Sequence, residues 1–120
     1  MAESKLRDHS MNFAVDVLKL CDSIKGHFSL TNQLERSATS IGANIHEANY
    51  AQSKADFTSK LQIALKECYE TEYWLELFVK SELIDREKAK IIYNDCVASI
   101  SYRKAIYHLA VANHYDINTI

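Results

Sequence analysis

Histidine, cysteine and glutamate are the residues of this chain whose types could hold a metal. A di-iron centre in a helical bundle needs Glu-x-x-His on two helices and two further carboxylates. The histidines, none of which has a glutamate three residues earlier, are His9, His27, His46, His108 and His114. His46 and Glu47 begin like a zinc-protease motif, but Tyr50 stands where the second histidine is required. We therefore predict no metal centre and no cofactor.

Acidic residues crowd one later segment with lysines on both sides of it. The members are Glu67, Glu70, Glu72, Glu76, Lys66 and Lys80. Glu76 and Lys80 have the spacing of an ordinary exposed i,i+4 ion pair, so the pattern indicates a solvated acidic face. The sequence has no Gly-x-Ser-x-Gly, Walker A or Gly-x-Gly-x-x-Gly motif. We expect the protein not to be an enzyme.

A polar stripe lies beside the apolar residues of the segment from 30 to 50. Its members are Gln33, Arg36, Ser40, Asn44 and Glu47. Arg36 and Glu47 are about 16 Å apart along a helix axis, so they cannot pair with each other. Each needs water, a neighbouring helix or a neighbouring subunit. The stripe is either a solvated flank or a helix contact, and the small residues Ser40, Gly42 and Ala43 would allow a close approach.

The elements that position these side chains are helices. The 120 residues are 48% hydrophobic and 25% charged, typical of one soluble globular domain. There is no proline, and the two glycines are Gly26 and Gly42. This scarcity disfavours a turn-rich β-sandwich or a glycine loop for phosphate, and it favours long helices. The formal net charge of −2 is not that of a basic protein that coats nucleic acid.

Apolar residues recur every three or four positions in four segments, which predict helices at about 4–25, 30–50, 54–81 and 86–113. Short loops between them force neighbouring helices to run antiparallel. The expected fold is all-α, an antiparallel up-down-up-down four-helix bundle that forms a single domain over residues 1–120. The predicted inner residues of the first three helices are Leu6, Phe13, Val17, Leu20, Cys21 and Ile24, then Leu30, Leu34, Ala38, Ile41, Ile45 and Ala48, then Phe57, Leu61, Ala64, Cys68, Thr71, Leu75 and Phe78. Those of the fourth helix include Ala89 and Ile92.

Capping residues mark the predicted helix ends. Gly26 follows the first helix as a C-terminal cap, and Ser29 or Thr31 would cap the start of the second. Ser53, with an aspartate three residues later, resembles a capping box. Asp85 would cap the fourth helix.

The third and fourth predicted helices carry apolar residues off their core stripes. These are Ile63, Tyr73, Trp74, Leu77, Ile91, Tyr102, Ile106 and Leu109. They either widen the core stripe or contact another subunit. A tryptophan about 140° from the core seam would face water in a monomer, and interface cores are rich in such residues. We predict that these faces bind further copies in a symmetric homo-oligomer.

Basic residues form a second candidate surface. The candidate nucleic-acid contacts are Arg86, Lys88, Lys90, Arg103 and Lys104. A ring of subunits would multiply this patch, although chains of net charge −2 repel phosphate at long range. No interleaving of basic and aromatic residues marks a base-stacking platform. The patch is either a solvated charged face or a contact for RNA or DNA.

Targeting signals are absent from the sequence. The first residues, MAESKLRDHS, are polar, and no run of about 18 apolar residues could span a bilayer. Cys21, Cys68 and Cys96 are odd in number, form no C-x-x-C pair and lie in apolar stripes. We interpret them as reduced core residues of a cytoplasmic protein without a membrane partner.

A specific motif runs through the second and third predicted helices. Residues 30–48, LTNQLERSATSIGANIHEA, match the pattern L-x-x-Q-x-x-R-(A/S)-x-x-S-I-x-x-N-I-x-E-(G/A). The match continues at Ser53, Asp56, Phe57, Leu61, Ile63, Ala64, Lys66, Glu67, Glu70, Thr71, Tyr73, Trp74 and Leu75. Together these residues resemble the 23S rRNA intervening-sequence protein family, whose members are also called four helix bundle proteins.

The resemblance implies a small cytoplasmic bacterial bundle, with a homopentamer as the favoured state and a structural polar stripe. Family members are similar to accessory proteins of diversity-generating retroelements, which form pentameric barrels and bind a reverse transcriptase and nucleic acid. The resemblance therefore also implies an alternative function, that of a nucleic-acid-binding accessory protein that acts with a reverse transcriptase. Those accessory proteins are strongly basic and this chain is not. His46 and Ala48 stand where many relatives have alanine and glycine, which indicates a subfamily.

Overall fold

The computed structural model describes residues 2–88 and 90–92, which form three helices and the first turns of another. The helices are α1 (Ala2–Asp22), α2 (Phe28–Ala48) and α3 (Lys54–Lys80). Residues 86–88 and 90–92 are helical and follow Asp85 directly, as predicted for the start of the fourth helix. No strand occurs within the described residues, so the all-α class is confirmed. The predicted continuation of the fourth helix to residue 113 lies outside them.

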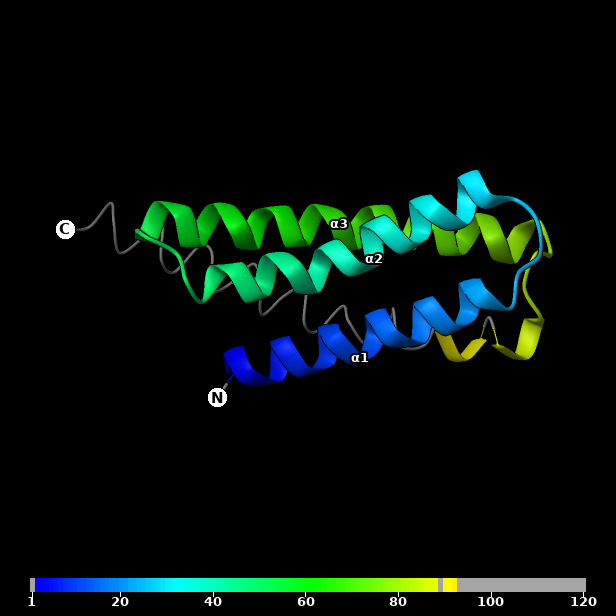
Figure 1. The fold of residues 1–120 in the computed structure, drawn as a ribbon, viewed down its shortest axis with the longest axis horizontal. Coiled ribbons are helices and arrows are strands. Elements are labelled where there is room, and N and C mark those ends of the chain that lie inside the picture. The colour runs from blue at the N-terminus through cyan, green and yellow to red at the C-terminus, as the bar shows by residue number, and fades with distance from the viewer. Residues whose placement is uncertain (1, 89, 93–120) are drawn as a thin grey trace.

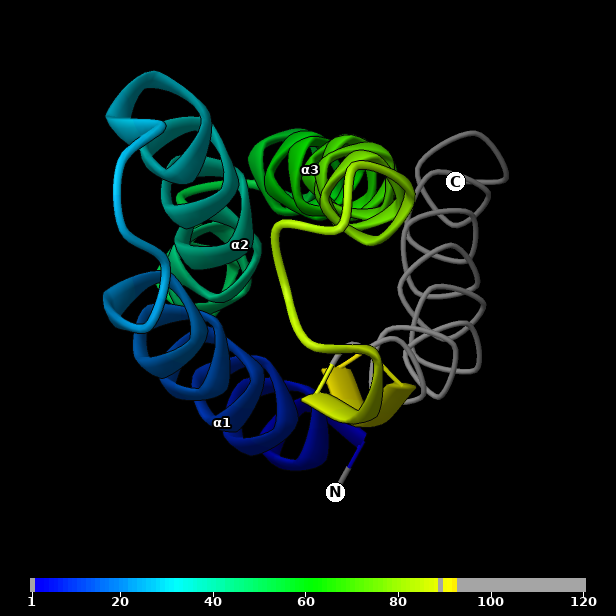
Figure 2. The ribbon, with the colours of Figure 1, turned by 90° about the vertical axis from the view of Figure 1, so that its right-hand side faces the viewer.

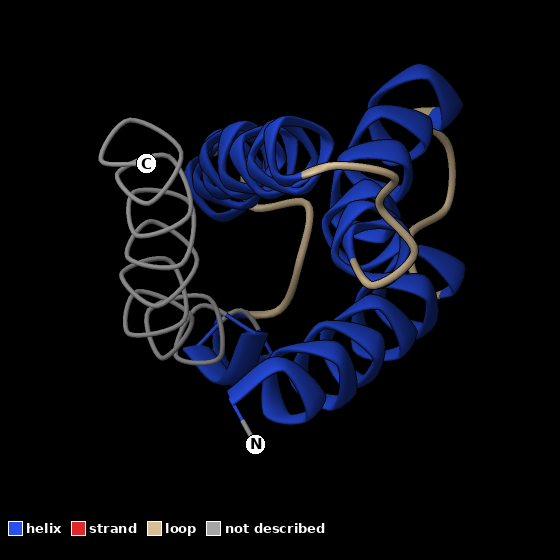
Figure 3. Cartoon of the chain, turned by 90° about the vertical axis from the view of Figure 1, so that its left-hand side faces the viewer, coloured by secondary structure: helices blue, strands red, loops and turns tan. Residues whose placement is uncertain are grey.

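The three helices lie side by side and run in alternate directions (Figure 1). α2 packs against both α1 and α3, whereas the backbones of α1 and α3 nowhere approach each other closely. The two end-on views show α1 and α3 flanking α2, with the chain after α3 crossing toward α1 (Figure 2, Figure 3). α2 is therefore the element that joins the described helices.

The core consists of the inward stripes that the periodicity predicted. Every predicted inner residue of α1, α2 and α3 is buried, apart from Leu30 and Phe57, which are half-buried against the same core. Ile84 and Ile92, from the chain after α3, complete this cluster. Each large apolar side chain removed from water contributes about 1.5–3 kcal/mol, so this burial is the main term that holds the helices together.

The start of α3 is capped as predicted. Ser53 Oγ accepts a hydrogen bond from the backbone N–H of Asp56 at 3.0 Å. The Asp56 carboxylate in turn accepts from the backbone N–H of Gln52 at 3.2 Å, one residue before the cap. These bonds satisfy N–H groups that have no partner within a helix.

The end of α1 differs from the prediction. The helix ends at Asp22 rather than near residue 25. Ser23 uses both its hydroxyl, at 2.6 Å, and its backbone N–H, at 3.0 Å, to bind the Leu20 carbonyl, which closes the helix in a tight last turn. Gly26 lies four residues beyond that end, so the prediction that it caps the helix is wrong.

The start of α2 also differs from the prediction. His27 is the N-cap, without a side-chain hydrogen bond, and Ser29 and Thr31 lie inside the helix. Gly26 and His27 have φ of 81° and 54°, so two consecutive left-handed residues reverse the chain here. The turn therefore depends on backbone conformation, which a search for capping side chains does not detect.

α3 ends in a Schellman motif. Leu83 N–H donates to the Phe78 carbonyl at 3.0 Å, and Glu82 N–H donates to the Val79 carbonyl at 3.1 Å. Glu82 supplies the left-handed residue of the motif, with φ of 58°, where glycine is the usual choice. The motif turns the chain so that Leu83 packs against the core.

Candidate functional site

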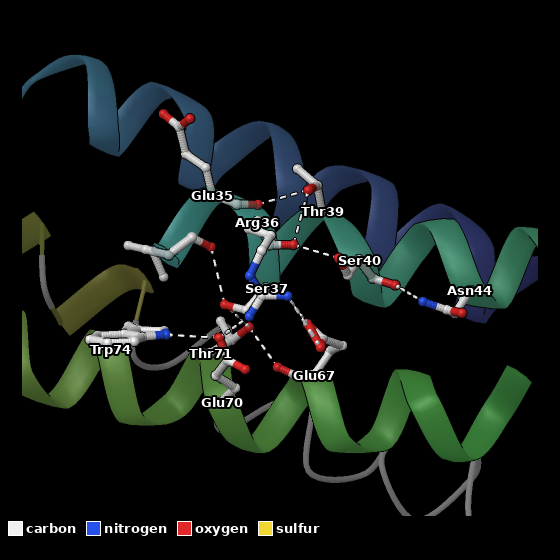
Figure 4. A network of polar contacts seen from close by, with 11 residues as sticks. Glu35, Arg36, Ser37, Thr39, Ser40, Asn44, Glu67, Glu70, Thr71 and Trp74 are labelled. Carbon is white, nitrogen blue, oxygen red and sulfur yellow. Dashed lines mark hydrogen bonds and ion pairs between the residues drawn. The ribbon is translucent and has the colours of Figure 1, made fainter. Parts of the chain in front are cut away.

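Arg36 of the predicted polar stripe is the centre of an interhelical network. Its Nη1 lies 3.3 Å from Glu67 Oε2, and its Nη2 hydrogen-bonds the Glu70 carboxylate (Figure 4). Trp74 Nε1 donates to that same Glu70 carboxylate at 3.1 Å. The sequence left three possible partners for Arg36: water, a neighbouring helix or a neighbouring subunit. The structure shows that Arg36 binds a neighbouring helix, α3.

The other charged member of the stripe also binds α3. Glu47 Oε1 accepts from Lys60 Nζ at 3.1 Å. Arg36 and Glu47 thus do not pair with each other, as their separation along α2 requires. Instead, both residues form ion pairs that join α2 to α3. Arg36 is the basic partner of its pairs, whereas Glu47 is the acidic partner of its own.

A buried hydroxyl pair lies beside the Arg36 network. Thr71 and Ser37 are both fully buried, and their hydroxyl oxygens are 3.0 Å apart. Each hydroxyl is also within hydrogen-bond distance of a carbonyl on its own helix, Leu34 at 3.2 Å for Ser37 and Glu67 at 2.7 Å for Thr71. Every polar group of this pair is satisfied within the contact, which is the condition for burying it without a penalty.

The middle of the polar stripe satisfies itself on α2. Ser40 Oγ donates to the Arg36 carbonyl at 2.6 Å, and Asn44 Nδ2 donates to the Ser40 carbonyl at 2.8 Å. Gln33, at the start of the stripe, is exposed. The five predicted residues therefore do not converge on one site: two bind α3, two bind their own helix and one faces solvent.

The charges of the Arg36 network stabilise one another. The hydrogen bond from Trp74, followed by those from Arg36, lowers the pKa of the Glu70 carboxyl. The hydrogen bond to Glu70 and the charges of Glu67 and Glu70 raise the pKa of Arg36. Glu70 is therefore held as an ionised acceptor at neutral pH, which suits a structural ion pair and not a proton donor. Arg36 is half-exposed, so solvent screens the stabilisation it gives.

α1 meets α2 closely at the predicted small residue Gly42. A Cβ placed on Gly42 would lie 3.2 Å from Ser10 Oγ and 3.5 Å from Ser10 Cβ. Ser10 is buried, and its hydroxyl donates to the Arg7 carbonyl at 3.0 Å. The prediction that another helix approaches here is confirmed, and that helix is α1 of the same chain.

The predicted interface residues of α3 divide into two classes. Ile63 and Tyr73 are 39% and 60% exposed. Trp74 and Leu77 are half-buried and pack against the core of their own chain. The expectation that Trp74 faces water in a monomer is therefore wrong, because its long indole lies back toward Glu70 and the core. For these two residues, the alternative that they widen the core stripe fits better.

The predicted interface residues of the fourth helix fall largely outside the description. Ile91 is exposed at 63%, and it begins the apolar stripe that the sequence predicts. Tyr102, Ile106 and Leu109 lie outside the described residues.

An exposed apolar stripe on α1 was missed by the sequence reasoning. Met11, Val15 and Leu18 are 61%, 40% and 41% exposed, on the side of α1 away from the core. Their i, i+4, i+7 spacing places them on one helix face. This spacing is present in the sequence, but the core stripe of the same helix gives a stronger pattern, and the prediction followed only that one.

The predicted nucleic-acid contacts that are described lie on the surface. Arg86, Lys88 and Lys90 are all exposed. Lys88 and Lys19 line a shallow groove of about 250 Å³ between α1 and the helical residues 86–88 and 90–92, together with Asp16, Leu20, Ser23, Ile91 and Ile92. Arg103 and Lys104 lie outside the described residues.

The described residues also bear on two other kinds of feature, a metal centre and a membrane-spanning helix. No three His, Cys, Asp or Glu side chains there are grouped so that they could hold a metal ion. None of the helices over that same part of the chain has the length and apolar character to cross a bilayer. Cys21 and Cys68 are buried, as the core interpretation requires, and Cys96 lies outside the described residues.

Comparison with known proteins identifies the family. The family model described as 23S rRNA-intervening sequence protein matches residues 2–105. The chain belongs to this family. No curated protein matches the chain.

A solved structure of a related protein supports this membership. It is described as a protein of unknown function from the S23 ribosomal protein family of Bacteroides thetaiotaomicron. The two chains share 46% sequence identity over 84% of this chain and 96% of that one, with a TM-score of 0.78. The helical arrangement of this member of the 23S rRNA-intervening sequence protein family is therefore shared with an experimentally determined relative.

The motif of the 23S rRNA-intervening sequence protein family coincides with the contact between α2 and α3. Arg36, Glu67, Glu70 and Trp74 are all motif positions, and all four belong to one network. Ser37 and Thr71 form the buried hydroxyl pair beside it. In this member of the family, the motif residues thus hold two helices in register.

Proposed function

We propose that this protein is a non-enzymatic, self-associating bundle, a homopentamer that acts as an assembly or adaptor module. The observation that carries this proposal is the apolar face of α3, where Tyr73 and Ile63 remain substantially exposed although the seam residues of the same helix are buried in the core. Exposed aromatic and aliphatic residues on one helix face are typical of protein contacts.

The polar residues support a structural role over a catalytic one. The side chains that could act on a substrate, Arg36, Glu67 and Glu70, bind one another across α2 and α3. Arg36 offsets part of the negative charge of the two glutamates, and Glu70 is held ionised. The family resemblance supplies the preference for five subunits, since an apolar face by itself indicates contact but not a rotation angle.

Sedimentation velocity of the purified full chain at micromolar concentration tests this proposal. We expect a single species of about five times the 13.7 kDa chain mass. The variant Tyr73→Glu places a charge in the proposed contact, and it should sediment as a monomer with unchanged helicity. Trp74 is a poorer probe, because it also binds Glu70 and the core of its own chain.

The chain offers a matched control for this variant. Tyr50 is a second exposed tyrosine, just beyond the end of α2, where it contacts the His46 ring. Tyr50→Glu introduces the same charge away from the α3 face and should leave the assembly intact. A wild-type chain that remains monomeric throughout the micromolar range contradicts the proposal.

Binding of RNA or DNA, as an accessory to an enzyme such as a reverse transcriptase, is the second candidate. Exposed Arg86, Lys88 and Lys90 favour it, since Lys88 and Lys19 of α1 line the same groove, so that basic residues of two elements lie along it. Asp16 lines that same groove and weakens its attraction for phosphate.

Retention of a labelled RNA at several salt concentrations tests this second candidate. Phosphate contacts are strongest at low ionic strength, so retention should fall steeply as salt rises. Lys88→Gln should weaken retention, while Lys54→Gln, an exposed lysine at the opposite end of the bundle, should not. Absence of binding at low salt removes this candidate and leaves the first untouched.

A further inference from the structure

Two exposed apolar patches lie on helices that do not touch each other. The α1 patch is Met11, Val15 and Leu18, and the α3 patch is the exposed Ile63, Tyr69 and Tyr73 together with the half-buried Leu77. α1 and α3 lie on different sides of α2, and their backbones make no close approach. Within the described residues, the patches of one chain therefore do not cover each other.

The two patches are complementary in side-chain type. The α1 patch is aliphatic and contains a methionine, whereas the α3 patch presents two tyrosines. Methionine sulfur and aromatic rings attract each other. Met11 to Leu18 spans about 10 Å along α1 and Tyr69 to Leu77 about 12 Å along α3, so the dense parts of the patches are of similar length.

The charges at the ends of the patches are complementary as well. Asp8 and Asp22 lie on the α1 face at the two ends of its patch, and both are exposed. Lys66 and Lys80 lie at corresponding ends of the dense part of the α3 patch, also exposed. Each pair is fourteen residues apart, about 21 Å along its helix, so two acids on one face match two bases on the other.

The ion pairs that these residues form within one chain do not prevent them from pairing with a second copy. Asp8 is 3.8 Å from Arg7 Nε, and Lys80 is 3.0 Å from Glu76, in pairs that are all largely exposed. Such surface pairs contribute little to stability.

We infer that the α1 patch of one copy binds the α3 patch of a second copy, in a head-to-tail contact. This inference rests on the proposed self-association and specifies its surfaces. Because the two patches differ, the contact is heterologous, and each subunit keeps one free patch of each kind until a ring closes. The partner is a second copy of this chain, whose Asp8 and Asp22 are opposite in sign to Lys66 and Lys80.

Blocking one patch at a time tests the inference by sedimentation velocity. Val15→Glu disables the α1 patch and Tyr73→Glu the α3 patch, and each should weaken association by at least about 30-fold, the effect of a residue central to an interface. Asn12→Glu, at an exposed polar position of α1, is the matched control and should assemble like the wild type. Circular dichroism and thermal melting establish that each variant is folded.

Mixing the two blocked variants gives the decisive result. Val15→Glu retains a working α3 patch and Tyr73→Glu retains a working α1 patch, so together they should form a 1:1 dimer of about twice 13.7 kDa. If Val15→Glu still assembles like the wild type, or if the mixture stays monomeric, the head-to-tail contact is wrong although self-association stands. A monomeric wild type instead overturns the proposed function, and this contact with it.

Charge reversal provides variants that leave the apolar patches intact. Asp8→Lys with Asp22→Lys, or Lys66→Asp with Lys80→Asp, should each weaken association, most strongly at low salt. All four changes in one chain restore the complementarity and the net charge, and association should return toward the wild-type level. Failure of the fourfold variant to recover contradicts the role assigned to these charges.

Discussion

The hydroxyl of Thr71 on α3 lies 3.0 Å from the hydroxyl of Ser37 on α2, and both side chains are fully buried. Leu34 and Leu75, also fully buried, are part of the apolar core around them. A directional bond inside an apolar seam favours one register of the two helices over those shifted by a turn. Arg36 reinforces that register, since it reaches Glu67 and Glu70 from the same stretch of α2.

Replacing Thr71 with valine should test the weight of this buried pair. Valine keeps the volume but not the hydroxyl, so the bond to Ser37 is lost while Ser37 retains the Leu34 carbonyl. We expect the free energy of unfolding to fall by about 1 kcal/mol in urea titrations at fixed protein concentration. Ser37→Ala with Thr71→Val should cost less than the two single changes summed. Strict additivity would contradict a direct bond.

The lowered pKa of Glu70 predicts a pH dependence of stability. Because its pKa is lower in the folded state than in the unfolded chain, ionised Glu70 stabilises the fold near neutral pH. This contribution is lost as the pH falls below about 4.3 and through the lowered pKa. Glu70→Gln should therefore be less stable than the wild type at pH 7, and the gap should narrow toward pH 3. An equal gap at both pH values in urea titrations argues against an ionic role.

The approach of Ser10 to Gly42 predicts a coupled pair of substitutions. Alanine in the middle of a helix is better than glycine by about 1 kcal/mol, but here its Cβ would meet Ser10 Oγ at 3.2 Å. In a Ser10→Ala background the nearest side-chain contact of that Cβ becomes the ordinary 3.5 Å to the Cβ of residue 10. Gly42→Ala should therefore stabilise the Ser10→Ala protein by more than it stabilises the wild type. Thermal melts of the four proteins measure this difference.

The Schellman motif at the end of α3 predicts a stabilising substitution. Glu82 holds φ of 58°, a conformation that glycine adopts without steric cost. Glu82→Gly should raise the free energy of unfolding by up to about 1 kcal/mol. Glu82→Val should lower it, because a β-branched residue tolerates this conformation least. Chemical denaturation that ranks valine above glycine would exclude the left-handed turn.

Burial should make Cys21 unreactive in the folded protein. Removal from solvent, with the nearby Glu35 and Asp22 carboxylates, raises the pKa of the Cys21 thiol to about 12. Almost no thiolate exists at pH 8, so iodoacetamide should leave Cys21 unmodified in buffer and alkylate it in denaturant. Peptide mass spectrometry resolves this site from the other cysteines. Rapid alkylation of the native protein at Cys21 would show that the residue is accessible.

The helices and their core were predictable because a single rule, apolar residues on one face, decides both. The α3 seam from Leu61 to Phe78 follows that rule at every position except Thr71, which is buried but polar. The end of α1 was not predictable in this way, because the Ser23 hydroxyl competes for the Leu20 carbonyl and closes the helix early. Local hydrogen bonds of this kind leave no periodic signal.

The polar contacts were predictable only in part. Spacing along α2 excluded a bond between Arg36 and Glu47, but the choice of Glu67 and Glu70 depends on how α3 is rotated about its axis. Trp74 shows the same limit, because a helical wheel gives the direction of Cβ and not where a long side chain lies. The α1 patch was readable from its spacing, and it was overlooked beside the stronger core stripe.

The dependence of both outer helices on α2 has a consequence for how the chain folds. Helix contacts in the described residues join only neighbours in sequence, α1 with α2 and α2 with α3. Closing so short a connection loses little chain entropy, and topologies built from such nearby pairings reach the native state in microseconds to milliseconds. The α1–α2 hairpin can therefore form on the ribosome before α3 has been synthesised, so that each later helix docks on a surface that is already present.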